Sequence, residues 1–351
     1  MKTRGRAQWP AAAARLALLL PLGRLHPSVA QWAQGRPAGE RWAVALSGGA
    51  DSVALLLLLA SHFPARARRL VALHFDHRLR GAESTGDARF CRELCRDLGI
   101  DFVGGRWSAR RRSRSEAGAR EARFAFMERV LAARRIRVLW LGHQQDDVAE
   151  TLLMRLARGS GASGLSAPRP VHAVESSRGA RGRIHVRPLL GLKKAEIEDA
   201  LARAGASWRT DSSNRKGEHF RNRLRKDVIP RWLLASERDA LAGAALSREL
   251  LEEDDLALEA WVDALGCLHP DGSLSVSGLA GRPRAVVRRA LHRWILAQPR
   301  AGALSRQGFE ALLRSVEAAT PSRHSLGRHG FAAIRAGRLT FERVRKTATP
   351  H

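Results

Sequence analysis

The sequence predicts an α/β protein in which helices cover both faces of a parallel β-sheet, followed by a smaller, mainly helical domain. Between residues 40 and 157, short apolar segments typical of buried strands alternate with longer segments whose apolar residues recur at helical spacing. A glycine-containing turn joins the first strand of this series to the first helix. Strands that alternate with helices run parallel and are buried on both faces, so we expect a Rossmann-like sheet.

The expected elements follow one another closely along the chain. Strands are expected over residues 41–46, 70–75, 100–103 and 137–141. Helices are expected over residues 53–60, 83–98, 116–133, 146–157 and 193–204. Residues 158–186, rich in Gly, Ser, Pro and Arg, are expected to form a loop region, and residues 329–341 two short strands joined by a glycine turn. We therefore place an N-terminal extension with a helix at 1–40, an α/β domain at 41–235 and a smaller, mainly helical domain at 236–351.

The charge of the chain favours a polyanionic partner. Its 351 residues carry a formal net charge of +27, which suits nucleic acid or an acidic membrane surface. Only six of the 61 basic residues are Lys, so a genome-wide bias toward Arg could contribute to this charge. No segment has the ~20 apolar residues that a membrane span requires. Residues 16–20 could begin a signal peptide, but Arg15 and Pro21 interrupt the run, so we expect a cytoplasmic protein with a leading helix packed on its core.

The turn between the first expected strand and helix carries a candidate phosphate site. Its two glycines let the backbone bend tightly, and the helix that follows presents free N–H donors to an anion. The acidic residue Asp51 suits such a site if a divalent cation links it to the phosphates. The alternative is an ordinary turn whose polar residues cap a helix. We favour nucleotide binding by Ser47, Gly48, Gly49, Ala50, Asp51 and Ser52.

Other phosphate or metal motifs are absent from the sequence or out of place. No Walker A motif occurs, and a GxGxxG pattern at residues 159–164 follows an expected helix instead of a strand. The three cysteines form no CxxC pair, which excludes a zinc ribbon and a disulfide framework. Cys91 and Cys95 are expected to be small buried side chains of one helix.

Residues 47–52, SGGADS, resemble the loop of the PP-loop, or N-type, ATP pyrophosphatases, which have an adenine nucleotide alpha hydrolase-like fold. These enzymes release pyrophosphate from ATP and adenylate a carbonyl oxygen. Further motifs resemble the tRNA(Ile)-lysidine synthetase family in this superfamily, and they follow the family order to about residue 230. They are DHRLR at 76–80, EAGAREARF at 116–124, HQQDDVAET at 143–151, RGSGASGL at 158–165, RPLL at 187–190 and DSSN with FRNR between 211 and 223.

The resemblance implies a carbon–nitrogen ligase with ATP as co-substrate and Mg2+ as cofactor. The wobble cytidine of the CAU anticodon of tRNA(Ile) would be adenylated at its C2 oxygen, and free L-lysine would then displace AMP. The implied partners are tRNA(Ile) and lysine, with no membrane, and a homodimer is kept as an option. The resemblance implies that the domain at 41–235 is the PP-loop catalytic domain and that the domain at 236–351 binds tRNA. Past residue 235 the resemblance is looser, and the chain is shorter than the longer family members.

Asp147 and Glu150 are the strongest candidates for the chemistry of lysine. They are three residues apart in an expected helix, so they share a face at the carboxyl end of the fourth strand. With Asp51 they are assigned to catalysis, and Asp51 and Asp147 are the expected Mg2+ ligands. His143, at the entry to this helix, is expected to face the substrate. The alternative is a capped helix start with acidic residues that favour the helix dipole.

Two further groups are assigned to the substrates. Arg120 and Arg123 share a face of one expected helix and are assigned to the ATP phosphates or the adenylated intermediate, with Arg120 counted as catalytic. Asp76, His77 and Arg80 follow the end of the second strand and are expected to face the substrate. A solvated basic face and a structural turn, respectively, are the alternatives.

The segment near residue 221 is expected to contact RNA. Arg221, Arg223 and Arg225 are assigned to the RNA backbone, against the alternative of a simple charge run. Two other functions stay open for the whole chain. One is a PP-loop tRNA thiolase or related amidotransferase, for which the expected cysteine pairs are missing. The other is an RNA-binding protein with a relic nucleotide loop, which the intact Ser47, Asp51, Asp147 and Glu150 disfavour.

Overall fold

A computed structural model of the chain describes residues 9–76, 82–107, 116–174, 182–210, 220–298, 304–327 and 330–343, with the backbone alone at 82–85, 116–117 and 119–120. It divides into two compact units, Met1–Leu251 and Glu252–His351. The boundary falls inside helix α11 (Ala240–Leu265), beyond the change of composition near residue 235. The first half of α11 packs on the first unit through Leu241 and Ala244. Each unit is described by itself below.

The first unit contains the expected parallel sheet. Its strands are β1 (Trp42–Ala45), β2 (Leu70–Asp76), β3 (Asp101–Arg106), β4 (Val138–Trp140), β5 (Val171–Val174) and β6 (Arg183–Val186). They are ordered β3-β2-β1-β4-β6-β5, and every neighbouring pair is parallel except β5 with β6. The predicted α/β fold class is thereby confirmed. The carboxyl ends of β1, β2 and β4 meet at one edge, where ligands of such sheets bind.

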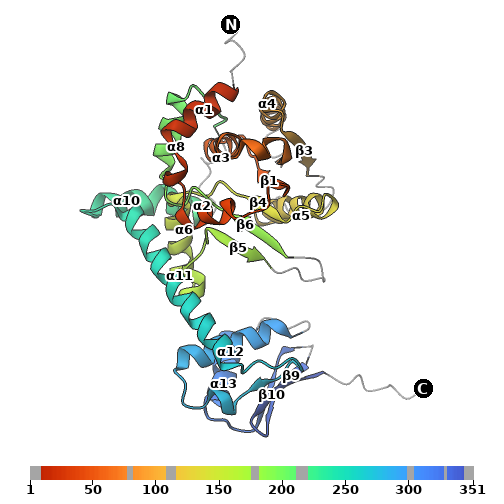
Figure 1. The fold of residues 1–351 in the computed structure, drawn as a ribbon. Coiled ribbons are helices and arrows are strands. Elements are labelled where there is room, and N and C mark those ends of the chain that lie inside the picture. The colour runs from red at the N-terminus through yellow and green to blue at the C-terminus, as the bar shows by residue number, and fades with distance from the viewer. Residues whose placement is uncertain are drawn as a thin grey trace. The chain divides into compact units, whose positions relative to one another are not determined.

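Helices cover both faces of this sheet (Figure 1). The α-helices of the first unit are α1 (Trp9–Leu19), α2 (Pro27–Gln34), α3 (Ala50–His62), α4 (Ala82–Leu98), α5 (Glu116–Ala133), α6 (Gln145–Leu156), α7 (Ala162–Leu165), α8 (Lys194–Arg203), α9 (Phe220–Arg223), α10 (Ile229–Ala235) and the first half of α11. Short 3-10 helices η1 (Leu22–Arg24) and η2 (Pro64–Arg69) and a π-helical segment η4 (Leu224–Val228) join them. Helices α1, α3, α4 and α8 pack in one core and α5 in another. The leading helix, α1, packs on the core as expected.

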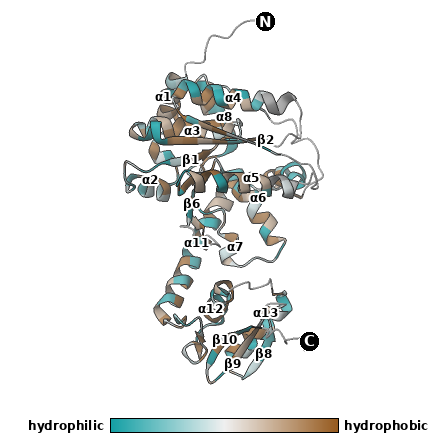
Figure 2. Cartoon of the chain, turned by 90° about the vertical axis from the view of Figure 1, so that its right-hand side faces the viewer, coloured by the Kyte–Doolittle hydropathy of each residue, from teal (hydrophilic) through white to brown (hydrophobic). Residues whose placement is uncertain are grey.

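Alternate residues of β1 point into these two cores. Trp42 and Val44 belong to the core under α3, whereas Ala43 belongs to the core under α5. Both cores consist of buried apolar side chains, which explains why the sequence of the strand is a continuous apolar run and not an alternating one. Figure 2 shows the same concentration of hydrophobic residues in the central strands and α3. Burial on both faces therefore fixes the position of β1 and of the turn that follows it.

Residues 158–186 differ from the expected loop region, because they include β5 and β6. Strand β6 lies next to β4 inside the sheet, with Ile184 opposite Val138. The expectation was wrong for these strands because Arg183 and His185 interrupt the apolar pattern. Both are buried, and Arg183 donates to the carbonyl of Ile136 at 2.8 Å. Tertiary hydrogen bonds thus let a polar segment form an interior strand.

The second unit combines helices with a small antiparallel sheet. Its helices are the second half of α11, η5 (Ser277–Leu279), α12 (Arg284–Ala297) and α13 (Arg306–Glu317), and its strands are β7 (Leu274–Ser275), β8 (Ser322–Ser325), β9 (Gly330–Arg335) and β10 (Arg338–Arg343). The sheet order is β7-β10-β9-β8. Residues 336 and 337 form the predicted glycine turn between β9 and β10, with φ values of 48° and 72°. Helices predominate, as predicted.

Within the described residues, no helix combines the length and the apolar character needed to cross a bilayer.

The tryptophans at the centre of the sheet should dominate the stability of the first unit. Trp140 is 1% exposed, and its ring centroid lies 4.8 Å from that of Trp42. We expect Trp140→Ala to lower the free energy of unfolding by about 3–5 kcal/mol, because the change leaves a cavity between two packed layers. Urea unfolding followed by far-UV circular dichroism checks this. Leu18→Ala is the control, since Leu18 is 82% exposed, and an equal loss in both variants would contradict the prediction.

Candidate functional site

The turn between β1 and α3 adopts a shape that requires glycine. Gly48 has φ +94°, and a Cβ atom there would lie 3.2 Å from the Sγ atom of Cys91. The Ser52 hydroxyl accepts from the backbone N–H groups of Ser47 and Gly48, both at 3.2 Å, and donates to the carbonyl of Gly49 at 3.0 Å. Ser52 therefore shapes the loop from inside the first turn of α3. The structure brings all six predicted loop residues into one turn at the carboxyl edge of the sheet.

Asp51 lies in the first turn of α3 with a largely buried carboxylate. One of its oxygens, Oδ1, is buried and has no hydrogen-bond partner in the described part of the chain. Burial and, to a smaller extent, the nearby negative charge of Asp147 raise the pKa of Asp51 from 3.8 to about 7, although the positive charge of Lys194 opposes the shift. A buried oxygen without a donor suits a cation, so Asp51 fits the role of one Mg2+ ligand.

The loop after β4 approaches α3 so closely that any side chain there would press on the backbone of α3. A Cβ atom on Gly142 would lie 3.0 Å from the carbonyl carbon and oxygen of Asp51 and 3.2 Å from the backbone nitrogen of Ser52. The absence of a side chain at residue 142 therefore lets the ends of β1 and β4 converge. Gly142 was not among the site residues predicted from the sequence, although a glycine between a buried strand and an acidic helix start was an available signal.

Two neighbouring carboxylates at the start of α6 have structural tasks. The Gln144 side chain accepts from the backbone N–H groups of Asp146 at 2.5 Å and Asp147 at 3.4 Å, and Asp147 accepts from the Gln144 N–H at 3.1 Å. This is a reciprocal capping box. Asp146 instead accepts from the backbone N–H of Lys194 at 3.0 Å, at the first turn of α8. The capped-helix alternative therefore describes Asp146 well.

Asp147 and Glu150 meet two arginines from the segment that follows residue 219. The Arg221 guanidinium donates to Asp147 Oδ1 and to Glu150 Oε2, both at 2.5 Å, and Arg225 donates to Glu150 Oε1 at 2.6 Å. Glu150 is 1% exposed, so its charge is compensated almost entirely by these partners. Arg221 and Arg225, assigned to RNA from the sequence, thus point to the carboxylates in this structure. The π-helical segment η4, which holds Arg225, is a feature often found at functional sites.

The remaining predicted residues are placed as follows. His143 accepts at Nδ1 from Arg187 Nε at 3.1 Å, beside the capping box. Asp76 is buried at the end of β2, and its carbonyl accepts from the N–H of Trp107 at 2.9 Å. The Arg123 guanidinium lies 5.6 Å from the ring centroid of Phe124. His77, Arg80 and the DSSN motif lie outside the described residues, as does the side chain of Arg120.

No group of three or more His, Cys, Asp or Glu side chains is arranged to hold a metal ion among the described residues. This is compatible with Mg2+, which proteins bind through one or two carboxylates while phosphates and water fill the other positions. Asp51 has the available oxygen. Asp147, the other predicted ligand, uses Oδ1 for Arg221 and Oδ2 for the Gln144 N–H.

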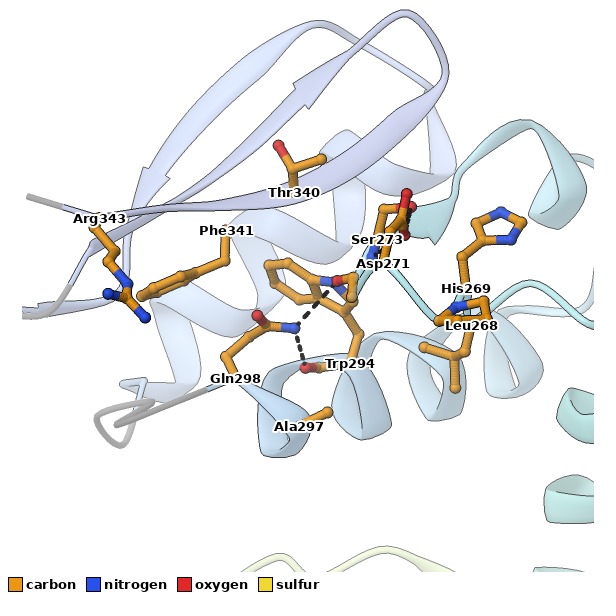
Figure 3. A pocket seen from close by; sticks show the side chains of 12 residues that line it. Leu268, His269, Asp271, Ser273, Trp294, Ala297, Gln298, Thr340, Phe341 and Arg343 are labelled. Carbon is orange, nitrogen blue, oxygen red and sulfur yellow. Dashed lines mark hydrogen bonds between the residues drawn. The ribbon is translucent and has the colours of Figure 1, made fainter.

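A cavity of about 660 Å³ lies in the second unit and contains none of the predicted site residues (Figure 3). Its wall includes Trp294, whose indole N–H donates to the carbonyl of Gly272 at 2.9 Å. The Gln298 amide donates to the carbonyls of Trp294 at 2.9 Å and Gly272 at 3.5 Å. These polar groups are engaged with the wall itself, so we assign no chemistry to this cavity.

Comparison with known proteins gives matches over the first unit and beyond. A family model described as the PP-loop domain matches residues 25–232. The chain is 39% identical over 301 residues to a tRNA(Ile)-lysidine synthase of Geobacter sulfurreducens, in an alignment that covers 81% of this chain and 61% of the relative. It is also 39% identical over 265 residues to the tRNA(Ile)-lysidine synthase of Solibacter usitatus. That alignment covers 72% of this chain and 57% of the relative. The alignments thus span about three fifths of the length of these relatives.

Matches to solved structures have lower sequence identity. A U34-tRNA thiolase of Methanococcus maripaludis with its 4Fe-4S cluster matches with a TM-score of 0.49 and 16% identity, over 69% of this chain and 78% of that chain.

The close approach at Gly142 can be tested by adding one methyl group. We expect Gly142→Ala to weaken ATP binding by about tenfold or more, because the added Cβ displaces the first turn of α3. Isothermal titration calorimetry with ATP and Mg2+ gives the Kd. Gly191→Ala is the matched control, since no atom lies within 4 Å of its added Cβ. Equal Kd values for the two variants would show that the contact does not position the loop.

The raised pKa of Asp51 predicts a pH-dependent effect on stability. Between about pH 4 and pH 7 the native state keeps a proton on Asp51 that the unfolded chain has released, so ionising this group lowers stability as pH rises through that window. Asp51→Asn removes the effect. The variant should therefore gain Tm relative to the wild type from pH 5 to pH 8, measured without nucleotide or Mg2+.

Asp199→Asn is the control for this pH series, because the Asp199 side chain is 65% exposed. Its Tm difference from the wild type should stay constant with pH. A Tm difference for Asp51→Asn that is the same at pH 5 and pH 8 would contradict the raised pKa.

Proposed function

Because this chain belongs to the PP-loop domain family, we propose that it is a ligase that attaches free L-lysine to C2 of the wobble cytidine in the CAU anticodon of tRNA(Ile). The reaction consumes ATP, releases pyrophosphate and AMP, and changes the codon read from AUG to AUA. Relatives named tRNA(Ile)-lysidine synthase support this proposal at 39% identity. The observation that carries it is the convergence of a phosphate loop with two carboxylates suited to an amine.

The phosphate end of the site supports adenylation. The loop at residues 47–52 and the N-terminus of α3 suit the diphosphate that leaves from ATP. Asp51 would hold Mg2+, which would neutralise charge on the phosphates when bound. In the first step the cytidine C2 oxygen attacks the α phosphorus and the bond to the β phosphate oxygen breaks. This step depends on in-line placement, which the rigid junction of β1 and α3 provides.

The carboxylate end of the site supports recognition of lysine. Asp147 and Glu150 already bind guanidinium groups at 2.5–2.6 Å, so they form a site for a cationic side chain. The ε-amine of lysine would take the place of one arginine there. In the second step the amine attacks the activated C2, the bond from C2 to the AMP oxygen breaks, and a carboxylate of this pair accepts the amine proton.

The other expected features belong to the same proposal. The net charge of +27 suits tRNA, and the second unit would contribute to tRNA binding. A cytoplasmic location is part of the same proposal, because the enzyme would need ATP and tRNA as substrates. The cysteines disfavour a thiolase, because all three are buried and burial raises the pKa of Cys91 and Cys267 and that of Cys95 to about 12. Exposed thiolates suited to sulfur transfer are therefore not available.

A direct assay tests this function. The protein is mixed with ATP, Mg2+, labelled lysine and a CAU-anticodon tRNA(Ile), and both label in the RNA and pyrophosphate release are measured. Both should appear, and both should vanish without ATP. We expect Asp51→Ala to lower the rate about 10²-fold or more, because a charge that positions the phosphates is lost. Asp199→Ala, at an exposed helix position, should retain the wild-type rate.

Two outcomes would contradict the proposal. Pyrophosphate release that needs tRNA but leaves no lysine in the RNA would indicate a different nucleophile. Lysine incorporation that proceeds without ATP would exclude the adenylated intermediate.

A further inference from the structure

Arg209 is tied to the phosphate loop by its backbone. It follows α8 in the chain, and its N–H donates to the carbonyl of Gly48 at 2.9 Å. The side chain of Arg209 also packs against the loop. Its Cγ atom lies 3.6 Å from the position that a Cβ atom on Gly48 would occupy. The position of Arg209 is thus fixed relative to the turn that would hold the diphosphate.

The guanidinium of Arg209 retains donors that can bind an anion. Its Nε donates to Oδ1 of Asp87, on α4, at 2.7 Å. Within the described chain its Nη groups have no hydrogen-bond partner, and the side chain is 47% exposed. An ion pair of such exposure contributes little to stability. Asp87 can therefore orient Arg209 without preventing it from turning to a second anion.

The loop needs a cation from outside itself. The backbone N–H groups of Ser47 and Gly48 donate to Ser52 Oγ, and that of Gly49 donates to Ser47 Oγ at 3.3 Å. Asp51 adds a carboxylate to the same turn. A triphosphate placed at the N-terminus of α3 would therefore meet three engaged loop N–H groups and an acidic side chain, so charge neutralisation must come partly from neighbouring side chains.

We propose that Arg209 is a substrate-binding residue whose guanidinium contacts the β and γ phosphates of ATP, the part that leaves as pyrophosphate. The planar fork of arginine matches phosphate oxygens, and the backbone contact with Gly48 places it at the correct end of the nucleotide. The inference rests on the proposed function only in requiring that ATP binds this loop.

Nucleotide titrations test the assignment. Kd values for ATP with Mg2+ and for AMP are measured by calorimetry or by competition with a labelled nucleotide. Arg209→Ala should raise the Kd for ATP about tenfold or more, as expected for the loss of a charge-assisted hydrogen bond. The same variant should change the Kd for AMP less than about twofold, since AMP lacks the phosphates concerned. Arg209→Lys should recover part of the ATP affinity.

Two further variants separate binding from a structural role. Asp87→Asn keeps the size and shape of the side chain but removes the negative charge that competes with ATP for Arg209. The Kd of this variant for ATP should therefore equal that of the wild type or be lower. Arg203→Ala, an exposed arginine on α8, should leave both Kd values unchanged, and melting temperatures confirm that each variant is folded.

The proposal is overturned if Arg209→Ala leaves the Kd for ATP unchanged. It is also overturned if Arg209→Ala raises the Kd for ATP and the Kd for AMP by the same factor. The same holds if Asp87→Asn raises the Kd for ATP as much as Arg209→Ala does, because Arg209 would then only position the loop. If the wild type binds ATP through Arg209 but attaches no lysine to tRNA, the proposed function fails and this inference stands.

Discussion

The contact between Gly142 and the first turn of α3 is the constraint on which the candidate site depends. It brings the end of β4 within van der Waals distance of the phosphate loop at the end of β1. Everything placed by β4, including the capping box at Gln144 and the carboxylates of α6, is thereby positioned relative to Asp51. The parallel register of β1 with β4 supplies the frame, and the missing side chain at residue 142 supplies the proximity.

The acidic side chains of the site differ in how far neighbouring cations and donors compensate their negative charge. Glu150 is buried and fully engaged with arginines, whereas Asp51 has a buried oxygen without a donor. This asymmetry separates two tasks on neighbouring helices. The carboxylate that is fully paired with arginines would suit a large organic cation, as the proposed function requires, and the carboxylate with a raised pKa suits a small metal ion or a proton. The two proposed chemical steps could therefore take place at one edge of the sheet without using the same carboxylate.

Much of the fold could be predicted from the sequence, and the site only in part. Strands such as β1 and β2 were recognisable because both faces are buried and apolar, and the loop at residues 47–52 because its residues are contiguous. Strand β6 was missed because Arg183 is paired through distant partners. Arg209 was missed for a similar reason, since its contact with Gly48 joins residues far apart in the chain. Local patterns identify elements and motifs, whereas contacts between distant segments decide which motifs meet.

The cap that Asp146 provides for α8 joins two helices that no sequence motif connects. Asp146 precedes Asp147, and the capped residue, Lys194, bears a charge that acts on Asp51. A substitution at Asp146 would loosen the start of α8 and change the electrostatic environment of Asp51 at once. In a mutational scan scored by activity, this residue would look indispensable because its carboxylate holds the first turn of α8. Loss of function there would report on the architecture around the reaction centre, and not on the chemistry of the carboxylate itself.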